Sequence, residues 1–191
     1  MSGTEEKSEL RRLLRARRRE LRATAFPAAE QVVEVYASQA RPPPKIAAFY
    51  VRCGGELDSK PLSVWFARQG VLICLPVVAA PERPLIFREI TGVLEPDTLG
   101  LPAPPPHAKA VEPDLIFVPL LGFDRTGARL GQGGGYYDRT LAARRASGPP
   151  ARAIGLAYAA QEVPRIPTDA FDQRLDGVLT EREYLDFKGV P

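Results

Sequence analysis

The chain of 191 residues has little of the side-chain chemistry from which zinc sites and disulfide frameworks are made, with two cysteines and one histidine. Cys53 and Cys74 form no C-x-x-C pair and have no histidine nearby, so we interpret both as reduced thiols of a cytoplasmic protein. His107 lies in the proline-rich stretch PAPPPHAKAVEP, where a solvated loop residue is expected rather than a catalytic base.

Long apolar runs are also missing. No run approaches the roughly 18 residues that a membrane span needs, and the charged N-terminus has no apolar signal-peptide core. We therefore expect a cytoplasmic protein with no membrane partner. Hydrophobic residues make up 45% of the chain, which is enough for one compact domain over residues 1–191.

Apolar segments of strand type alternate with segments of helical period. Helices are predicted over 4–23, after Pro27, and over 61–70 and 136–146; strands over 45–51, 71–78, 85–90, 114–121, 151–158 and 176–181. Thr4 and Ser59 are expected to cap helices, and Gly70 to end one. The alternation predicts an α/β fold with a mostly parallel or mixed central sheet flanked by helices. Ligands of such sheets bind at the carboxyl ends of the strands.

The N-terminal helix, residues 1–24, is strongly basic. One acid, Glu20, stands among the arginines Arg11, Arg12, Arg15, Arg17, Arg18, Arg19 and Arg22. This helix could present a solvated amphipathic face, act as a phosphate-binding arm, or bind nucleic acid without sequence preference. Lys7 and Arg11 lie four residues apart and share one face, so both can reach one triphosphate.

The stretch RLGQGGGYYDR, residues 129–139, places a glycine-rich turn directly before a predicted helix. Backbone N–H groups and the helix dipole make such a turn an anion site, although a plain flexible turn is the alternative. Arg129 and Arg139 could add charge, and Asp138 could hold Mg²⁺ beside phosphate oxygens. Tyr136 and Tyr137 could stack on a flat ring. The stretch matches neither GxxxxGK[ST] nor GxGxxG.

Taken whole, DLIFVPLLGFDRTGARLGQGGGYYDRTL resembles the signature of the 5-formyltetrahydrofolate cyclo-ligase family. The matching residues are Val118-Pro119, Phe123-Asp124, Gly127, Arg129-Leu130-Gly131, Gly133 to Gly135 and Tyr136-Tyr137-Asp138. Four further segments match in order: KSELR with Lys7 and Arg11, GGELDSKPL with Glu56, AIGLAYAAQ with Gln161, and FDQRLDGVLTE with Asp172. Gln132, Ala103 and Phe171 depart from the family pattern, which usually has tyrosine or arginine, glutamate and histidine there.

The resemblance implies MgATP-dependent conversion of 5-formyltetrahydrofolate to 5,10-methenyltetrahydrofolate, ADP and phosphate. It implies catalytic roles for Glu56 and Arg129, a folate pocket of Val51, Glu56 and Tyr136, and Mg²⁺ ligands Asp138 and Asp172. The implied ATP site comprises Lys7, Arg11, Arg129, Leu130, Gly131, Gln132, Gly133, Gly134, Gly135, Tyr136 and Tyr137. The remaining arginines of the helix need only be solvated. We expect a monomer that does not bind nucleic acid; the alternative is a basic nucleotide- or RNA-binding module that keeps the fold without the chemistry.

Overall fold

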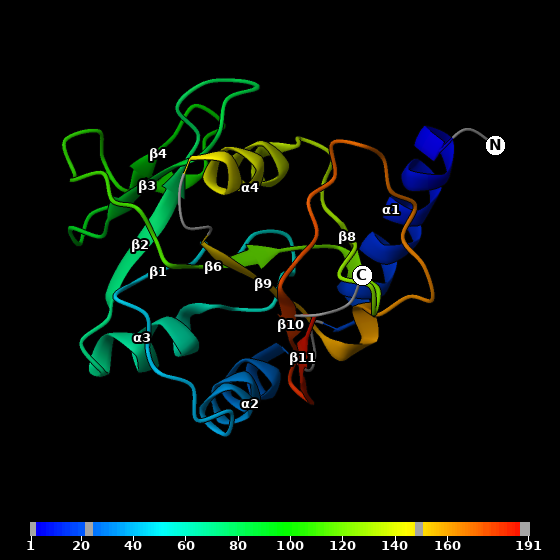
Figure 1. The fold of residues 1–191 in the computed structure, drawn as a ribbon, viewed down its shortest axis with the longest axis horizontal. Coiled ribbons are helices and arrows are strands. Elements are labelled where there is room, and N and C mark those ends of the chain that lie inside the picture. The colour runs from blue at the N-terminus through cyan, green and yellow to red at the C-terminus, as the bar shows by residue number, and fades with distance from the viewer. Residues whose placement is uncertain (1–2, 22–24, 148–150, 188–191) are drawn as a thin grey trace.

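The structure, a computed structural model, describes residues 3–21, 25–147 and 151–187. One seven-stranded sheet runs through the molecule in the order β11-β10-β9-β6-β1-β2-β3 (Figure 1). In that order its strands are Tyr184–Asp186, Gly177–Leu179, Arg152–Leu156, Leu115–Pro119, Ile46–Ala48, Leu72–Val77 and Ile86–Glu89. The five inner strands pair in parallel, whereas β3 and β11 pair antiparallel at the two edges. The predicted mixed α/β sheet is confirmed.

Helices cover both faces of the sheet (Figure 1). On one face lies α4 (Tyr136–Ala146); on the other lie α2 (Ala25–Ala37) and α3 (Lys60–Arg68). The basic helix α1 (Gly3–Glu20) stands to the side and contacts the short 3₁₀ helix η2 (Ala159–Gln161). Among the described helices, none is both long and apolar enough to cross a membrane.

The core forms on both sides of the central strands because strand side chains alternate between faces. In β6, Leu115 and Phe117 pack toward α2 and α3, while Ile116 and Val118 pack toward α4. The Phe117 ring stacks on Phe49 at 4.7 Å between centroids. A continuous apolar run such as 115–118 is therefore the signature of a strand buried on both faces.

Helix ends follow the predicted signals only in part. Gly70 takes a φ of +79° just after α3, as expected of a glycine that ends a helix. Ser59 stands at the N-cap position, but its hydroxyl donates to the Tyr50 carbonyl instead of capping the helix. The prediction for Thr4 is wrong, because α1 begins at Gly3 and Thr4 lies inside its first turn.

Several short strands were not predicted. They are the edge strand β11 and two two-residue hairpins, β4–β5 (Glu95–Pro96 and Pro102–Ala103) and β7–β8 (Gly122–Phe123 and Arg129–Leu130). The β7–β8 hairpin leads directly into the glycine-rich segment, which in turn opens α4. The chain thus brings the end of β6, the hairpin and the start of α4 to one place.

Candidate active site

A cavity of about 1150 Å³ opens at the carboxyl ends of β1, β2 and β6. The strand ends contribute Tyr50, Pro76 and Pro119 to its lining, α1 contributes Lys7 and Arg11, and the glycine-rich segment forms one wall. Every site residue that the sequence predicted lines this cavity: Lys7, Arg11, Val51, Glu56, Arg129, Leu130, Gly131, Gln132, Gly133, Gly134, Gly135, Tyr136, Tyr137, Asp138 and Asp172. Segments more than a hundred residues apart in the chain therefore form one site.

The glycine-rich segment ends in the turn that starts α4. Gly133 has a φ of +106°, and Gly135, the N-cap residue, has a φ of +66°. Residues with a Cβ atom rarely adopt either conformation, which explains why both positions are glycine. The N-terminus of α4, with its partial positive charge, opens into the cavity beside this turn. This is the arrangement of an anion site.

Three arginines hold the carbonyl groups of the turn. Arg11 Nε donates to the Gly131 carbonyl at 3.0 Å, and Arg139 Nη2 donates to that of Gly134 at 2.7 Å. Arg15 donates to the side-chain oxygen of Gln132 at 3.0 Å and to its carbonyl at 3.4 Å. In a trans peptide the next N–H points opposite to the carbonyl. These contacts therefore turn backbone N–H groups of the segment away from the arginines.

A second tight turn presents Glu56. Gly54 and Gly55 have φ values of +55° and +83°, and the Glu56 N–H donates to the Cys53 carbonyl at 3.1 Å. In return, the Cys53 N–H donates to Glu56 Oε2 at 3.0 Å. The loop is closed below by the Tyr50 hydroxyl, which donates to the Leu57 carbonyl at 2.7 Å. The Glu56 carboxylate is thus fixed at one oxygen before any ligand arrives.

Glu56 lies in a low-polarity environment beside aromatic groups. Burial raises its pKa, opposed by the hydrogen bond from Cys53 and by the nearby Arg18 guanidinium. Burial, reinforced by the Glu56 charge, also raises the pKa of Tyr50 and of Tyr137. Both phenols are therefore neutral at neutral pH.

Arg129 is a buried cation, 8% exposed, at the base of the glycine-rich wall. Its Nη2 lies 2.7 Å from Asp138 Oδ1, and its Nη1 donates to the Gln173 carbonyl. Burial lowers the pKa of Arg129, and Asp138 opposes that effect. The Gln173 N–H also donates to Asp138 Oδ1 at 3.0 Å. The guanidinium thus connects the start of α4 to the segment that carries Asp172.

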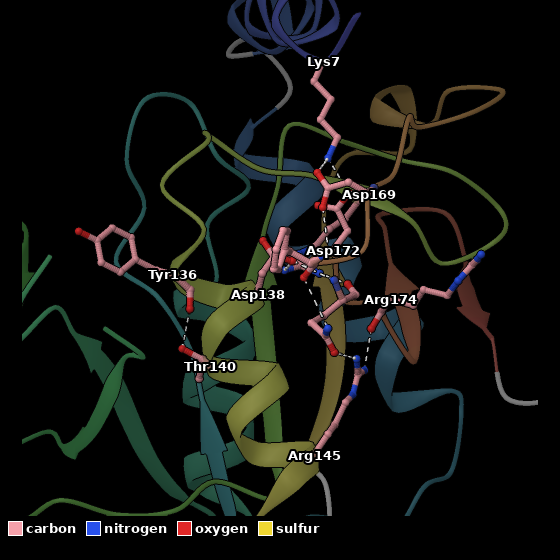
Figure 2. Close-up of polar contacts among 11 residues, drawn as sticks. Lys7, Tyr136, Asp138, Thr140, Arg145, Asp169, Asp172 and Arg174 are labelled. Carbon is pink, nitrogen blue, oxygen red and sulfur yellow. Dashed lines mark hydrogen bonds and ion pairs between the residues drawn. The ribbon is translucent and has the colours of Figure 1, made fainter. Parts of the chain in front are cut away.

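Lys7 reaches from α1 across to this segment, as Figure 2 shows. Its ammonium lies 2.7 Å from Asp169 Oδ2 and 2.6 Å from Asp172 Oδ2. Burial lowers the pKa of Lys7, but the hydrogen bonds to the two carboxylates outweigh it and raise the pKa overall.

The Tyr136 ring points away from this cluster in Figure 2, and the Arg139 guanidinium lies 5.0 Å from the centroid of that ring.

The two predicted metal ligands, Asp138 and Asp172, suit Mg²⁺ only if phosphate oxygens complete its coordination. The contacts of Asp138 fall on Oδ1 and those of Asp172 on Oδ2, so each carboxylate keeps a second oxygen for a cation. Within the described ranges, no group of three or more histidine, cysteine or acidic side chains could hold a metal by itself. This donor set suits an ion that takes one or two carboxylates together with phosphate oxygens.

Sequence reasoning missed residues that support the site. The expectation that the other arginines of α1 are merely solvated is wrong, because Arg18 is 3% exposed and Arg15 binds Gln132. The spacing of Lys7, Arg11, Leu14 and Arg18 on one helix face was the available signal. Asp169 was missed because its role is apparent only from its ion pair with Lys7 in the folded protein.

Two residues of the resemblance prove to be structural. Asp124, 2% exposed, accepts hydrogen bonds from Thr126, Ala128 and Ile166 N–H groups and so ties the β7–β8 hairpin to a distant loop. Gln161, 1% exposed, donates to the Leu120 and Leu121 carbonyls after β6. Neither lines the cavity described above. The predicted solvated loop position of His107 is confirmed, since the residue is exposed between β5 and β6.

Comparison with known proteins agrees with the geometry. The family model of the 5-formyltetrahydrofolate cyclo-ligase family matches residues 3–181. A Haemophilus influenzae protein of that name is 30% identical over 93% of this chain and 98% of its own, and a Mycolicibacterium smegmatis protein is 31% identical over 94% and 95%. The solved Aquifex aeolicus 5,10-methenyltetrahydrofolate synthetase is 28% identical, with a TM-score of 0.75 over 95% of this chain and 93% of its own. The Mycoplasma pneumoniae synthetase, 22% identical with a TM-score of 0.71, shares the fold over 92% of this chain and 99% of its own. The chain belongs to the 5-formyltetrahydrofolate cyclo-ligase family.

Proposed function

We propose that this protein converts 5-formyltetrahydrofolate and ATP to 5,10-methenyltetrahydrofolate, ADP and phosphate. The observation that carries the proposal is that one cavity brings together the glycine-rich anion site, two carboxylates suited to Mg²⁺ and the separately held Glu56. Membership of the family supports the same reaction. Three arginines of α1 contact other parts of the chain: Arg15 binds Gln132, Arg11 binds Gly131 and Arg18 pairs with Glu56. These contacts favour a role of α1 in the wall of the site over a role in binding nucleic acid.

The chemistry begins at a poor leaving group, the formyl oxygen. That oxygen attacks the γ-phosphorus of ATP, and the bond to ADP breaks, leaving an iminium phosphate. N10 then bonds to the activated carbon and loses its proton, and the carbon–oxygen bond breaks to release phosphate. The protein takes little part in the covalent steps, so it accelerates the reaction mainly by positioning the substrates and stabilising charge.

Each wall of the cavity has a role in this scheme. Lys7, Arg11, Arg129 and the segment from Leu130 to Tyr137 would hold the triphosphate, through backbone N–H groups and positive charge. Asp138 and Asp172 would hold Mg²⁺, which neutralises phosphate charge when bound. Glu56 would orient the pterin or formyl group, in a pocket shaped by Val51 and Tyr136.

The direct test mixes the protein with MgATP and 5-formyltetrahydrofolate at neutral pH and follows the absorbance of the methenyl product. We expect product to form with ADP in equal amounts, and to fall to the uncatalysed level when ATP is omitted or Mg²⁺ is chelated. Neutral pH matters because acid alone promotes the cyclisation. Equal product without ATP, or no product with all components present, would refute the proposal.

The position of Lys7 gives a prediction about ATP. In Lys7→Ala the affinity for ATP should fall roughly tenfold, because one charge-assisted contact is worth about 1.5–3 kcal/mol and Lys7 must first leave Asp169 and Asp172. The affinity for 5-formyltetrahydrofolate should change less. Calorimetric titration with each substrate measures both. Arg12→Ala removes an exposed cation of the same helix and is the control; an unchanged ATP affinity in Lys7→Ala would make the lysine purely structural.

A further inference from the structure

Arg18 is an unusual member of the basic helix. Its residue is 3% exposed, whereas its neighbours Arg17 and Arg19 are exposed on the same helix. A buried guanidinium is costly unless a charge or hydrogen bonds compensate it. Its Nε and Nη1 have no hydrogen-bond partner among the described residues. The compensation must therefore come from a nearby charge.

That charge is Glu56. Arg18 Nη1 lies 3.5 Å from Glu56 Oε1, and the two side chains are 4% and 11% exposed. The guanidinium packs under the glycine turn that presents Glu56, since a Cβ added at Gly54 would lie 3.4 Å from Arg18 Nη2. The Cys53 N–H fixes the other oxygen, Oε2. The two contacts together hold both oxygens of the carboxylate.

Glu56 lines the cavity, whereas Arg18 lies behind it and is not among the lining residues. Arg18 therefore does not line the site itself, and it meets the cavity lining at the Glu56 carboxylate. We propose that Arg18 is a positioning residue that keeps the Glu56 carboxylate ionised and aimed at the folate substrate. This inference rests on the proposed function, in which Glu56 orients the pterin or formyl group.

The groups around Glu56 make Arg18 the relevant cation. Tyr50 from the end of β1 and Tyr137 from α4 are near enough for the Glu56 charge to act on them; burial, reinforced by that charge, raises the pKa of each, so both stay neutral. Burial raises the pKa of Glu56, and the Cys53 N–H and the Arg18 charge lower it. Without Arg18 the Glu56 pKa should rise further. A larger fraction of Glu56 would then be protonated at any given pH, and activity would be lost at a higher pH on acidification.

The test compares full-length Arg18→Met and Arg18→Lys with the parent, and uses Arg19→Met as an exposed control one residue away. In Arg18→Met we expect ATP affinity to stay within about twofold and kcat/KM for 5-formyltetrahydrofolate to fall about tenfold, equivalent to about 1.4 kcal/mol. The acidic limb of its pH profile should shift upward. Arg18→Lys keeps the charge and should retain the parental limb, with a partial loss of kcat/KM. Arg19→Met should match the parent.

A double variant gives the decisive measurement. In a Glu56→Gln background, Arg18→Met should cause little further loss of kcat/KM, because both changes act through one carboxylate. Additive losses, an unmoved acidic limb, or parental kcat/KM in folded Arg18→Met would overturn the inference. If Arg18→Met does not fold, the partial loss of kcat/KM in Arg18→Lys provides the test, because that loss should disappear in the Glu56→Gln background and an additive loss there would overturn the inference. Failure of the parent to make methenyl product would instead refute the proposed function itself.

Discussion

Glu56→Gln should lower the rate of methenyl formation by about a hundred- to a thousandfold in a protein that still folds, although less stably, because the buried Arg18 loses its paired charge. The substitution keeps the size of the side chain and its ability to accept from Cys53, but removes the charge that faces the cavity. An interaction made in the transition state and worth about 2.7–4 kcal/mol accounts for a loss of that size. ATP binding should persist, because the proposed phosphate contacts lie on α1 and the glycine-rich wall. Single-turnover product formation and nucleotide titration, measured together, test both parts.

Glu34→Gln, an exposed change on α2, is the matched control and should leave both measurements at the parental value. Near-parental turnover in folded Glu56→Gln would remove the proposed role of this residue. Loss of folding together with nucleotide binding would show instead that Glu56 is a structural residue that holds the turn of residues 53–56 and pairs with Arg18.

Asp138→Asn should impair both stability and Mg²⁺ use. Arg129, its side chain 5% exposed, would lose its paired charge. Breaking a buried pair is strongly destabilising; because the Asp138 side chain is 28% exposed, we expect about 2–3 kcal/mol, or roughly 4–12 °C in Tm. The Mg²⁺ concentration for half-maximal activity should rise roughly ten- to a hundredfold, the loss typical when metal-site residues are changed. Thermal unfolding and Mg²⁺ titrations of activity measure these effects.

Asp172→Asn separates the two consequences. Its carboxylate pairs with Lys7, which Asp169 also holds, so stability should change little. The dependence on Mg²⁺ should shift as it does in Asp138→Asn. Unchanged Mg²⁺ dependence in both variants would show that these carboxylates only organise Arg129 and Lys7. A shift in Asp138→Asn alone would assign the metal to one carboxylate.

The strongly apolar central segments of this fold could be predicted from the sequence, and its edges could not. The run 115–118 is apolar on both faces of the sheet and is found as a central parallel strand. By contrast, β11 has only three residues, Tyr-Leu-Asp, which follow the charged run Glu-Arg-Glu. Its pairing with β10 depends on tertiary placement rather than on local preference. The antiparallel direction of β3 likewise follows from the loop after β2, which leaves no helix for a crossover.

The candidate site shows the same division. Glycines 133 and 135 and the adjacent tyrosines are contiguous in the chain, so their pattern alone indicates a backbone that a ligand approaches. The partners of Lys7 are 162 and 165 residues away, and no local pattern connects them. By charge, Arg18 looks like its exposed neighbours in a run of arginines, and its spacing from Leu14 on one helix face is the sequence signal for its burial against the 53–56 turn. Charge density along a helix does not reveal which charge faces inward.

The structural roles of Asp124 and Gln161 bear on how other sequences should be interpreted. Both bind backbone groups around the β7–β8 hairpin, and neither residue lines the cavity. A related chain that lost its catalytic chemistry would still need them to fold, and would still match much of the signature. Glu56 instead holds its own turn and pairs with Arg18 beside the cavity. In a genome survey, the presence of Glu56 together with Lys7 should therefore distinguish working enzymes from inactive relatives better than the overall similarity score.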